Sequence, residues 1–336
     1  MFKKYPQFVV SLFLLIGLVF GLVQPANAMI KISPSKQIST IDVDPVVLSE
    51  MNTKGSTGYW IEFADEIDLS AAEEMDWSDR GWFVFNTLSN AASTSQASTV
   101  KFLADAGISY KTHWINNSIY VARSDRSVLS GLMSFSGIDS IRSPRTYFLY
   151  EPDKSGAKDD NGINAIEPSL AHIHVDDVWG MGFTGSGIVV ANIDTGVRYT
   201  HEALVDQYRG NNGDGTFSHD YNWFDPYGEY SFPADNNSHG THTMGTMVGD
   251  DGGVNQIGIA PGADWMACRA CNTSTCSDVA LLTCAEFVAA PTTIDGTFPN
   301  PDLRANIVNN SWGDCSQTYD GWFQNVINIW HAAGIY

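Results

Sequence analysis

The first residues of the chain combine a basic start with an apolar run. Lys3 and Lys4 precede an apolar stretch at 8–23, and the small-residue pattern Ala26-Asn27-Ala28 follows it. This order is typical of a secretory signal peptide. A membrane anchor is the alternative, but the run is short for a bilayer-spanning helix, and the cleavage pattern follows it closely. We therefore expect residues 1–28 to be removed and the remaining chain to be secreted, extracellular and free of the membrane.

Residues 29–57 are polar and predict a linker, whereas a compact pattern follows at 58–150. Its hydrophobic periodicity indicates both kinds of element. Asn116-Asn117 is expected to form the turn of a hairpin. The order β-α-β-β-α-β is typical of a small α+β, ferredoxin-like domain. The expected strands are 59–63, 108–114, 118–122 and 138–141, and the expected helices are 95–106 and 127–135.

A charged, glycine-containing segment at 151–162 separates this pattern from the rest of the chain, 151–336. We expect it to be an exposed connector, the kind of segment where proteolytic cutting concentrates. Strands and helices then alternate, which predicts an α/β fold with a parallel sheet and flanking helices. Strands are expected at 188–193, 264–268 and 307–310, and helices from residue 239, at 278–289 and at 319–333.

Composition narrows the classes of partner. The 336 residues contain 18 Lys and Arg against 38 Asp and Glu, a net charge of −20, which argues against a nucleic-acid partner. Four of the five cysteines lie close together at 268, 271, 276 and 284, with Cys315 apart. For an exported chain, one or two local disulfides are expected in place of a zinc site, with one thiol left over and the pairing open.

Two polar motifs mark the ends of predicted elements. Asp194 closes an apolar strand, and functional groups gather at the carboxyl ends of parallel strands. His239 begins a helix for which Ser238 is the expected N-cap. His242 follows three residues later, so a zinc hydrolase that uses Asp194, His239 and His242 is an alternative. The His-Glu-x-x-His spacing of zinc proteases is absent, and we expect His242 to be a buried structural residue.

A third motif follows the strand expected at 307–310. Ser311, Trp312 and Gly313 come directly after its apolar residues. A strand that stops at glycine leaves backbone N–H and C=O groups open, and an extended peptide can pair with them. We expect Ser311, Trp312 and Gly313 to bind a protein or peptide substrate.

In this order, the three motifs resemble those of the subtilisin-like serine proteases. Asp194-Thr195-Gly196 is similar to the Asp motif of the family, and His239-Gly240-Thr241-His242 is similar to its His motif. Asn309-Asn310-Ser311-Trp312-Gly313 resembles the substrate-binding strand of the family. Its residue sequence is most similar to that of bacillopeptidase F-like members. The resemblance implies a subtilisin-like parallel sheet, preceded by an intramolecular propeptide at 58–150.

The resemblance also implies peptide hydrolysis by an Asp-His-Ser triad. His239 would be the general base and Asp194 would orient it. This chemistry requires no cofactor, and no metal is assigned to the reaction. The family often binds structural calcium, but no site is assigned here, because Ala203 stands where an acidic ligand is common.

One part of the family pattern is missing. No Gly-Thr-Ser motif occurs in the chain, and the expected position of the oxyanion-hole Asn is not reached before Tyr336. We therefore expect a C-terminally truncated zymogen, the N-terminal part of a precursor that is inactive as given. The alternative is a non-enzymatic protein, in which residues 58–150 act as a folding chaperone or inhibitor of a dead peptide-binding remainder.

Overall fold

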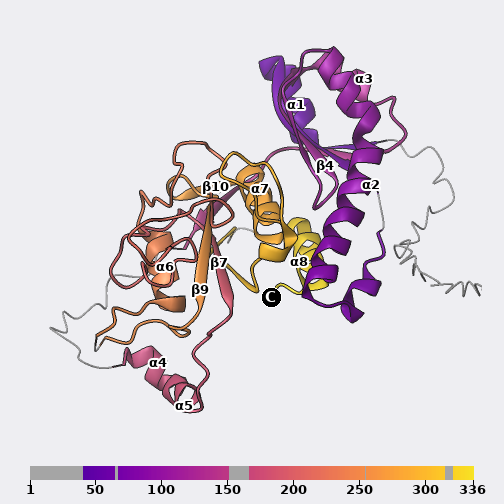
Figure 1. The fold of residues 1–336 in the computed structure, drawn as a ribbon. Coiled ribbons are helices and arrows are strands. Elements are labelled where there is room, and N and C mark those ends of the chain that lie inside the picture. The colour runs from indigo at the N-terminus through magenta and orange to yellow at the C-terminus, as the bar shows by residue number, and fades with distance from the viewer. Residues whose placement is uncertain (1–40, 65–66, 151–165, 254, 315–320) are drawn as a thin grey trace, which may run out of the picture.

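The computed structural model describes residues 41–336 except 65–66, 151–165, 254 and 315–320 (Figure 1). The predicted signal peptide, the connector at 151–162 and Cys315 lie outside the described residues. The rest forms an N-terminal unit, residues 41–150, and a second unit, residues 166–336. Within the described ranges, no helix is both long enough and apolar enough to cross a membrane.

The N-terminal unit is a five-stranded sheet in the order β1-β5-β2-β4-β3, covered on one face by helices. Side chains alternate between the two faces along a strand. Tyr59 and Ile61 accordingly point into the core of this unit, whereas Trp60 between them packs against the second unit. The β-α-β-β-α-β prediction is confirmed by β2 (Ser56–Phe63), α2 (Trp77–Asp105), β3 (Tyr110–His113), β4 (Ser118–Asp125), α3 (Arg126–Leu132) and β5 (Ile138–Arg142).

The predicted linker at 29–57 is wrong over its last part. Strand β1 (Asp42–Val43) pairs in parallel with β5, and helix α1 (Pro45–Lys54) packs on the sheet. The carboxylate of Asp44 accepts a hydrogen bond from the backbone N–H of Val46, and proline follows as the first helical residue. Both are strong helix-start signals. The ordered N-terminal unit therefore begins well before residue 58.

The second unit contains a parallel four-stranded sheet in the order β11-β7-β9-β8. Its two faces carry different cores, because Val190 packs with helix α6 and Ala191 packs with α7 and α8. Figure 1 shows α7 and α8 on the side that faces the N-terminal unit. The elements are β7 (Val189–Asp194), β8 (Trp223–Phe224), α6 (His239–Val248), β9 (Asp264–Arg269), α7 (Asp278–Ala289), β11 (Ile307–Asn310) and α8 (Gln324–Ala332), with two short helices before them, α4 (Pro168–His172) and α5 (Val175–Gly180).

Two disulfides link neighbouring segments of the second unit. Cys268 in β9 is bonded to Cys284 in α7, and Cys271 is bonded to Cys276 in β10 (Thr275–Ser277). The expectation of local disulfides is confirmed.

The last strand of the N-terminal unit belongs to a sheet of the second unit. Strand β6 (Thr146–Leu149) lies between β10 and β12 (Trp312–Gly313) and pairs with both in antiparallel fashion. Residues 146–149 are therefore the central strand of a sheet whose two outer strands belong to the second unit.

The two units also meet along the helices. The N-terminal half of α2 lies against α8 and the turn η3 (Pro301–Leu303). The Arg80 guanidinium donates to the backbone carbonyls of His331 and Ala332, and the buried Arg304 donates to the carbonyl of Trp77.

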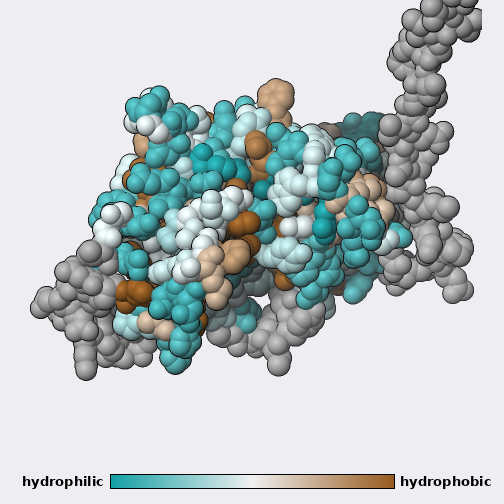
Figure 2. Space-filling model, turned by 60° about the horizontal axis from the view of Figure 1, so that its bottom comes forward, coloured by the Kyte–Doolittle hydropathy of each residue, from teal (hydrophilic) through white to brown (hydrophobic). Residues whose placement is uncertain are grey.

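The face of the molecule shown in Figure 2 is mostly hydrophilic, with hydrophobic residues in small groups. One hydrophobic core cluster contains buried residues of both units.

Candidate active site

Asp194 and His239 are brought into direct contact. Asp194 ends β7 with its side chain fully buried, and His239 is the first residue of α6. Oδ1 of Asp194 lies 2.7 Å from Nδ1 of His239. The proximity expected from the sequence is confirmed.

Further donors hold the Asp194 carboxylate. Its Oδ1 accepts a hydrogen bond from the backbone N–H of Thr195 at 2.7 Å. Its Oδ2 accepts one from the hydroxyl of Thr243 at 3.1 Å. Each oxygen of the buried carboxylate thus has a donor, as a buried charge requires.

The start of α6 is capped by a residue other than the expected one. Ser238 precedes the helix with a φ of 77° and makes no side-chain cap bond. The carboxylate of Asp235 instead accepts hydrogen bonds from the backbone N–H groups of Asn237, Ser238 and Thr241. Asp235 also accepts one from the hydroxyl of Thr195. A carboxylate at a helix N-terminus satisfies the open N–H groups and interacts favourably with the helix dipole.

Two glycines allow the Asp194 turn and α6 to touch. Gly196 has a φ of 104°, which L side chains rarely adopt, and a Cβ there would lie 1.9 Å from the carbonyl oxygen of Ala234. A Cβ on Gly240 would lie 2.1 Å from the carbonyl oxygen of Gly196. The helix can carry His239 up to Asp194 only because both positions lack a side chain.

The imidazole of His239 is placed to carry a positive charge. The hydrogen bond to Asp194 raises the pKa of His239, and burial opposes the rise. Nε2 lies 3.2 Å from the backbone carbonyl oxygen of Tyr150. A carbonyl only accepts, so this contact needs a hydrogen on Nε2, while Nδ1 faces a carboxylate. Both ring nitrogens donate in the imidazolium form.

The segment that reaches His239 is the end of β6. Its residues Leu149 and Phe148 pair with Trp312 and Gly313 in β12. A Cβ on Gly313 would lie 2.9 Å from the hydroxyl of Tyr150, so the Tyr150 side chain lies directly over this glycine. An extended segment thus pairs along Trp312 and Gly313 and ends with its carbonyl at His239.

Aromatic side chains receive one residue of this strand. Tyr147 is 4% exposed and packs edge-on against Trp312 and stacked against Trp322. Ser311, the remaining residue of the predicted motif, accepts a hydrogen bond from the Asn309 side chain. The main-chain pairing and one buried aromatic side chain therefore fix the segment.

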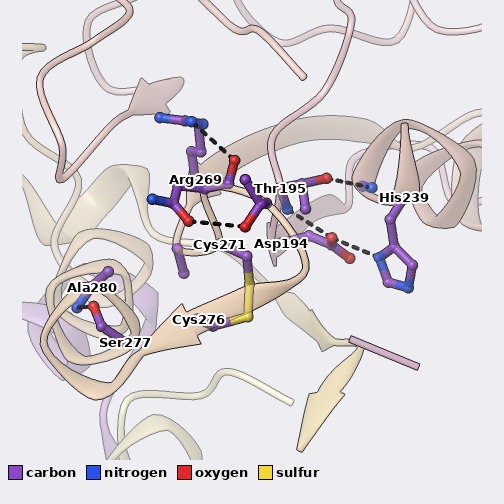
Figure 3. Close-up of a disulfide and its surroundings, with 12 residues drawn as sticks. Asp194, Thr195, His239, Arg269, Cys271, Cys276, Ser277 and Ala280 are labelled. Carbon is purple, nitrogen blue, oxygen red and sulfur yellow. Dashed lines mark hydrogen bonds and ion pairs between the residues drawn. A yellow bond between two sulfur atoms is a disulfide. The ribbon is translucent and has the colours of Figure 1, made fainter. Parts of the chain in front are cut away.

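A disulfide loop supports Asp194 from the other side. The backbone N–H of Cys271 donates to the backbone carbonyl of Asp194 at 3.0 Å. Figure 3 shows Asp194 between the Cys271–Cys276 loop and His239. Nearby, the buried Arg269 pairs with Asp225 and Glu229. The backbone at Asp194 is therefore tied to a cross-linked loop.

His242 does not occupy the buried position that the sequence predicts. It is exposed and lines a pocket of about 650 Å³ together with Arg198, His201 and Glu167. The buried side of α6 follows His239, Gly240, Met244 and Val248, and a residue at 242 falls outside this stripe. Among the residues that the structure describes, no group of three or more His, Cys, Asp or Glu side chains is placed to hold a metal.

Comparison with known proteins identifies the second unit. Residues 185–335 match the model of the family described as "Subtilase family". Bacillopeptidase F of Bacillus subtilis (strain 168) is 34% identical over 266 residues, which are 75% of this chain and 18% of that protein. Residues 185–335 belong to the subtilase family. The minor extracellular protease Vpr of the same organism is 36% identical to this chain over 109 residues, 31% of the chain and 12% of Vpr. The chain thus spans less than a fifth of either relative.

A solved structure supports the same fold. A mutant of the epidermin leader peptide processing serine protease (EpiP) from Staphylococcus aureus superimposes with a TM-score of 0.51 at 14% identity, covering 83% of this chain and 59% of that chain. The likeness shows the fold alone. The fold of the second unit is subtilisin-like, with a parallel sheet and flanking helices, as the sequence predicts.

Proposed function

We propose that this chain is the N-terminal part of the precursor of a secreted subtilisin-like serine endopeptidase. The observation that carries the proposal is the double contact of His239, with the Asp194 carboxylate at Nδ1 and the Tyr150 carbonyl at Nε2. This is the arrangement of a general base that has its orienting acid on one side and a peptide group on the other. Protein or peptide substrates follow from the backbone pairing along β12.

The proposed chemistry is acyl transfer. His239 first gives up the hydrogen that Nε2 donates to Tyr150 in the structure. A serine hydroxyl then adds to the carbonyl carbon of the peptide bond while its proton passes to Nε2 of the neutral imidazole. The same nitrogen then protonates the departing amine, and water hydrolyses the resulting ester. Asp194 stays ionised and stabilises the imidazolium. These 336 residues contain no Gly-Thr-Ser motif to supply this serine. We therefore expect this chain alone to hydrolyse no peptide.

The N-terminal unit is proposed to be an intramolecular propeptide, and the Tyr150–Glu151 bond its cleavage site. The support is the position of β6, which fills the place of an extended substrate and brings the carbonyl of Tyr150 to His239. Export is supported by the pattern at 1–28, and Vpr is an extracellular protease by its name. No cofactor takes part in the proposed reaction.

The complete reading frame, expressed and secreted, tests this proposal. N-terminal sequencing of the mature product should give Glu151 as its first residue. His239→Ala should leave the precursor uncut, while His242→Ala, a change of the exposed histidine on the same helix, should be cut normally. Cleavage in the His239→Ala variant would refute the general base, and a mature N-terminus elsewhere would refute the assignment of the bond.

A non-enzymatic role is the second candidate, and the occupied cleft favours it. Strand β6 fills the space between β10 and β12, so residues 41–150 block the site in the structure as it stands. In this case the N-terminal unit is a chaperone or inhibitor of a peptide-binding remainder. A complete reading frame that is secreted and folded but never cut would support this function over proteolysis.

A further inference from the structure

One buried and one half-buried polar residue, Asn192 and Thr243, lie behind the Asp194 carboxylate. Asn192 precedes Asp194 by two residues in β7, so both side chains point to the same face of the sheet. Thr243 follows His239 by four residues in α6, so both lie on the same side of the helix. Asn192 is 1% exposed. The register of strand and helix thus brings all four side chains together.

The hydrogen bonds of this cluster determine which way the Thr243 hydroxyl points. The Asn192 side-chain amide donates to the Thr243 hydroxyl oxygen and to the Gly240 carbonyl, each at 3.0 Å. The single hydrogen of Thr243 then has two acceptors at 3.1 Å, Oδ2 of Asp194 and the Gly240 carbonyl. The carboxylate is the stronger acceptor, and Gly240 already receives the amide of Asn192. The Thr243 hydrogen therefore goes to Asp194.

The cluster continues to the substrate-binding strand. The side-chain carbonyl of Asn192 accepts a hydrogen bond from the amide of Asn309 at 2.9 Å. The same side-chain amide of Asn309 also donates to the hydroxyl of Ser311, the residue directly before β12. A continuous series of hydrogen bonds thus joins the peptide-binding strand to the far oxygen of Asp194.

We propose that Thr243 is a positioning residue, which holds Oδ2 of Asp194 so that Oδ1 faces His239. The inference rests on the proposed function, in which Asp194 orients His239. Thr195 alone would hold one oxygen and leave the carboxylate able to turn about its Cβ–Cγ bond. Thr243 supplies the second point of attachment, and Asn192 aims the hydroxyl.

The test is an NMR titration of His239 in the intact 336-residue chain, labelled with 13C and 15N in histidine. Among the described residues, the groups that act on the imidazole are the carboxylates of Asp194 and Asp235 and the carbonyl of Tyr150. Thr243→Val keeps the shape of the side chain and removes the hydroxyl. The carboxylate then loses the attachment of Oδ2 and can turn Oδ1 away from Nδ1, so the proton affinity of His239 should fall by roughly three- to tenfold.

Two control variants make the result specific. Thr243→Ser keeps a hydroxyl and should restore the wild-type titration midpoint. Thr246→Val removes a hydroxyl from the same helix that bonds to the His242 carbonyl, and it should change nothing. A native backbone spectrum for Thr243→Val with an unchanged or higher midpoint would overturn the proposal. The titration needs no turnover, so it stands independently of whether the complete protein cleaves its precursor.

Discussion

Glu286 makes a strong prediction about how the two units hold together. Its carboxylate, on α7 of the second unit, accepts hydrogen bonds from the backbone N–H of Trp114 at 2.6 Å and of Ile115 at 3.3 Å. Its other oxygen lies 3.1 Å from Nδ1 of the buried His113. Glu286→Ala would leave these donors of the hairpin between β3 and β4 without their partner.

The cost can be worked from these contacts. A hydrogen bond to a charged group contributes about 1.5–3 kcal/mol, and the bond to Trp114 is the shorter of the two. Counting the weaker bond to Ile115 as a fraction of this gives about 3 kcal/mol for Glu286→Ala. That loss corresponds to a roughly 100-fold larger population of the locally opened hairpin, and hence to faster amide exchange there. Amide hydrogen exchange of residues 110–118, followed by mass spectrometry on the intact chain, measures it directly.

Several comparisons keep this test sharp. Glu286→Gln retains an acceptor oxygen and should produce only part of the acceleration. Glu202→Ala, at an exposed position that pairs with Arg198, should leave exchange at 110–118 unchanged. Exchange in α3, on the opposite face of the N-terminal sheet, serves as an internal reference. Wild-type exchange at 110–118 in Glu286→Ala would refute the interpretation of Glu286 as a docking residue.

Three further predictions concern the second unit. Gly240→Ala should displace α6 and lower the NMR titration midpoint of His239, while Gly245→Ala, with open space around it, should not; equal midpoints would contradict the close packing. Because the pKa of His239 is raised, its charged pair with Asp194 stabilises fully below the ordinary value of 6.5 and less as pH rises through the folded value. The difference in free energy of urea unfolding between the wild type and Asp194→Asn should therefore become smaller as the pH rises through that range. A difference that does not change with pH would refute the raised pKa of His239. Cys268→Ser opens a bond between residues 16 apart and should cost about 3 kcal/mol in urea unfolding, a difference that disappears when both proteins are reduced.

The fold could be predicted where elements bury a regular stripe against their own sheet. Helix α7 begins and ends where the sequence predicts, because apolar residues fill it and Ser277 caps it. Helix α1 was missed because Val46 and Leu48, two of its apolar residues, are exposed and leave no clear stripe. The sequence predicts a helix only from residue 95, whereas α2 begins at Trp77. Its first half buries Gly81 against Arg304 of the second unit, a contact that no local periodicity reveals.

The site was predictable in part for the same reason. Asp194 and His239 stand at element ends, where the sequence marks them, and the structure brings their side chains into contact. Thr243 carries a signal in hindsight, because it follows His239 by one helical turn. Tyr150 carries none, since its carbonyl reaches His239 only through the pairing of β6 with strands far along the chain. Long-range pairing of this kind leaves no mark on neighbouring residues.

The contacts of α2 set an order for folding during synthesis. Ser78 bonds to Asp302, 224 residues later, and Arg80 bonds to Ala332, 252 residues later. The first half of α2 cannot find these partners until more than 200 further residues have been made. The sheet of the N-terminal unit pairs only its own strands and can close much earlier. The first half of α2 would then stay unpaired beside a finished sheet until its partner surface has been synthesised.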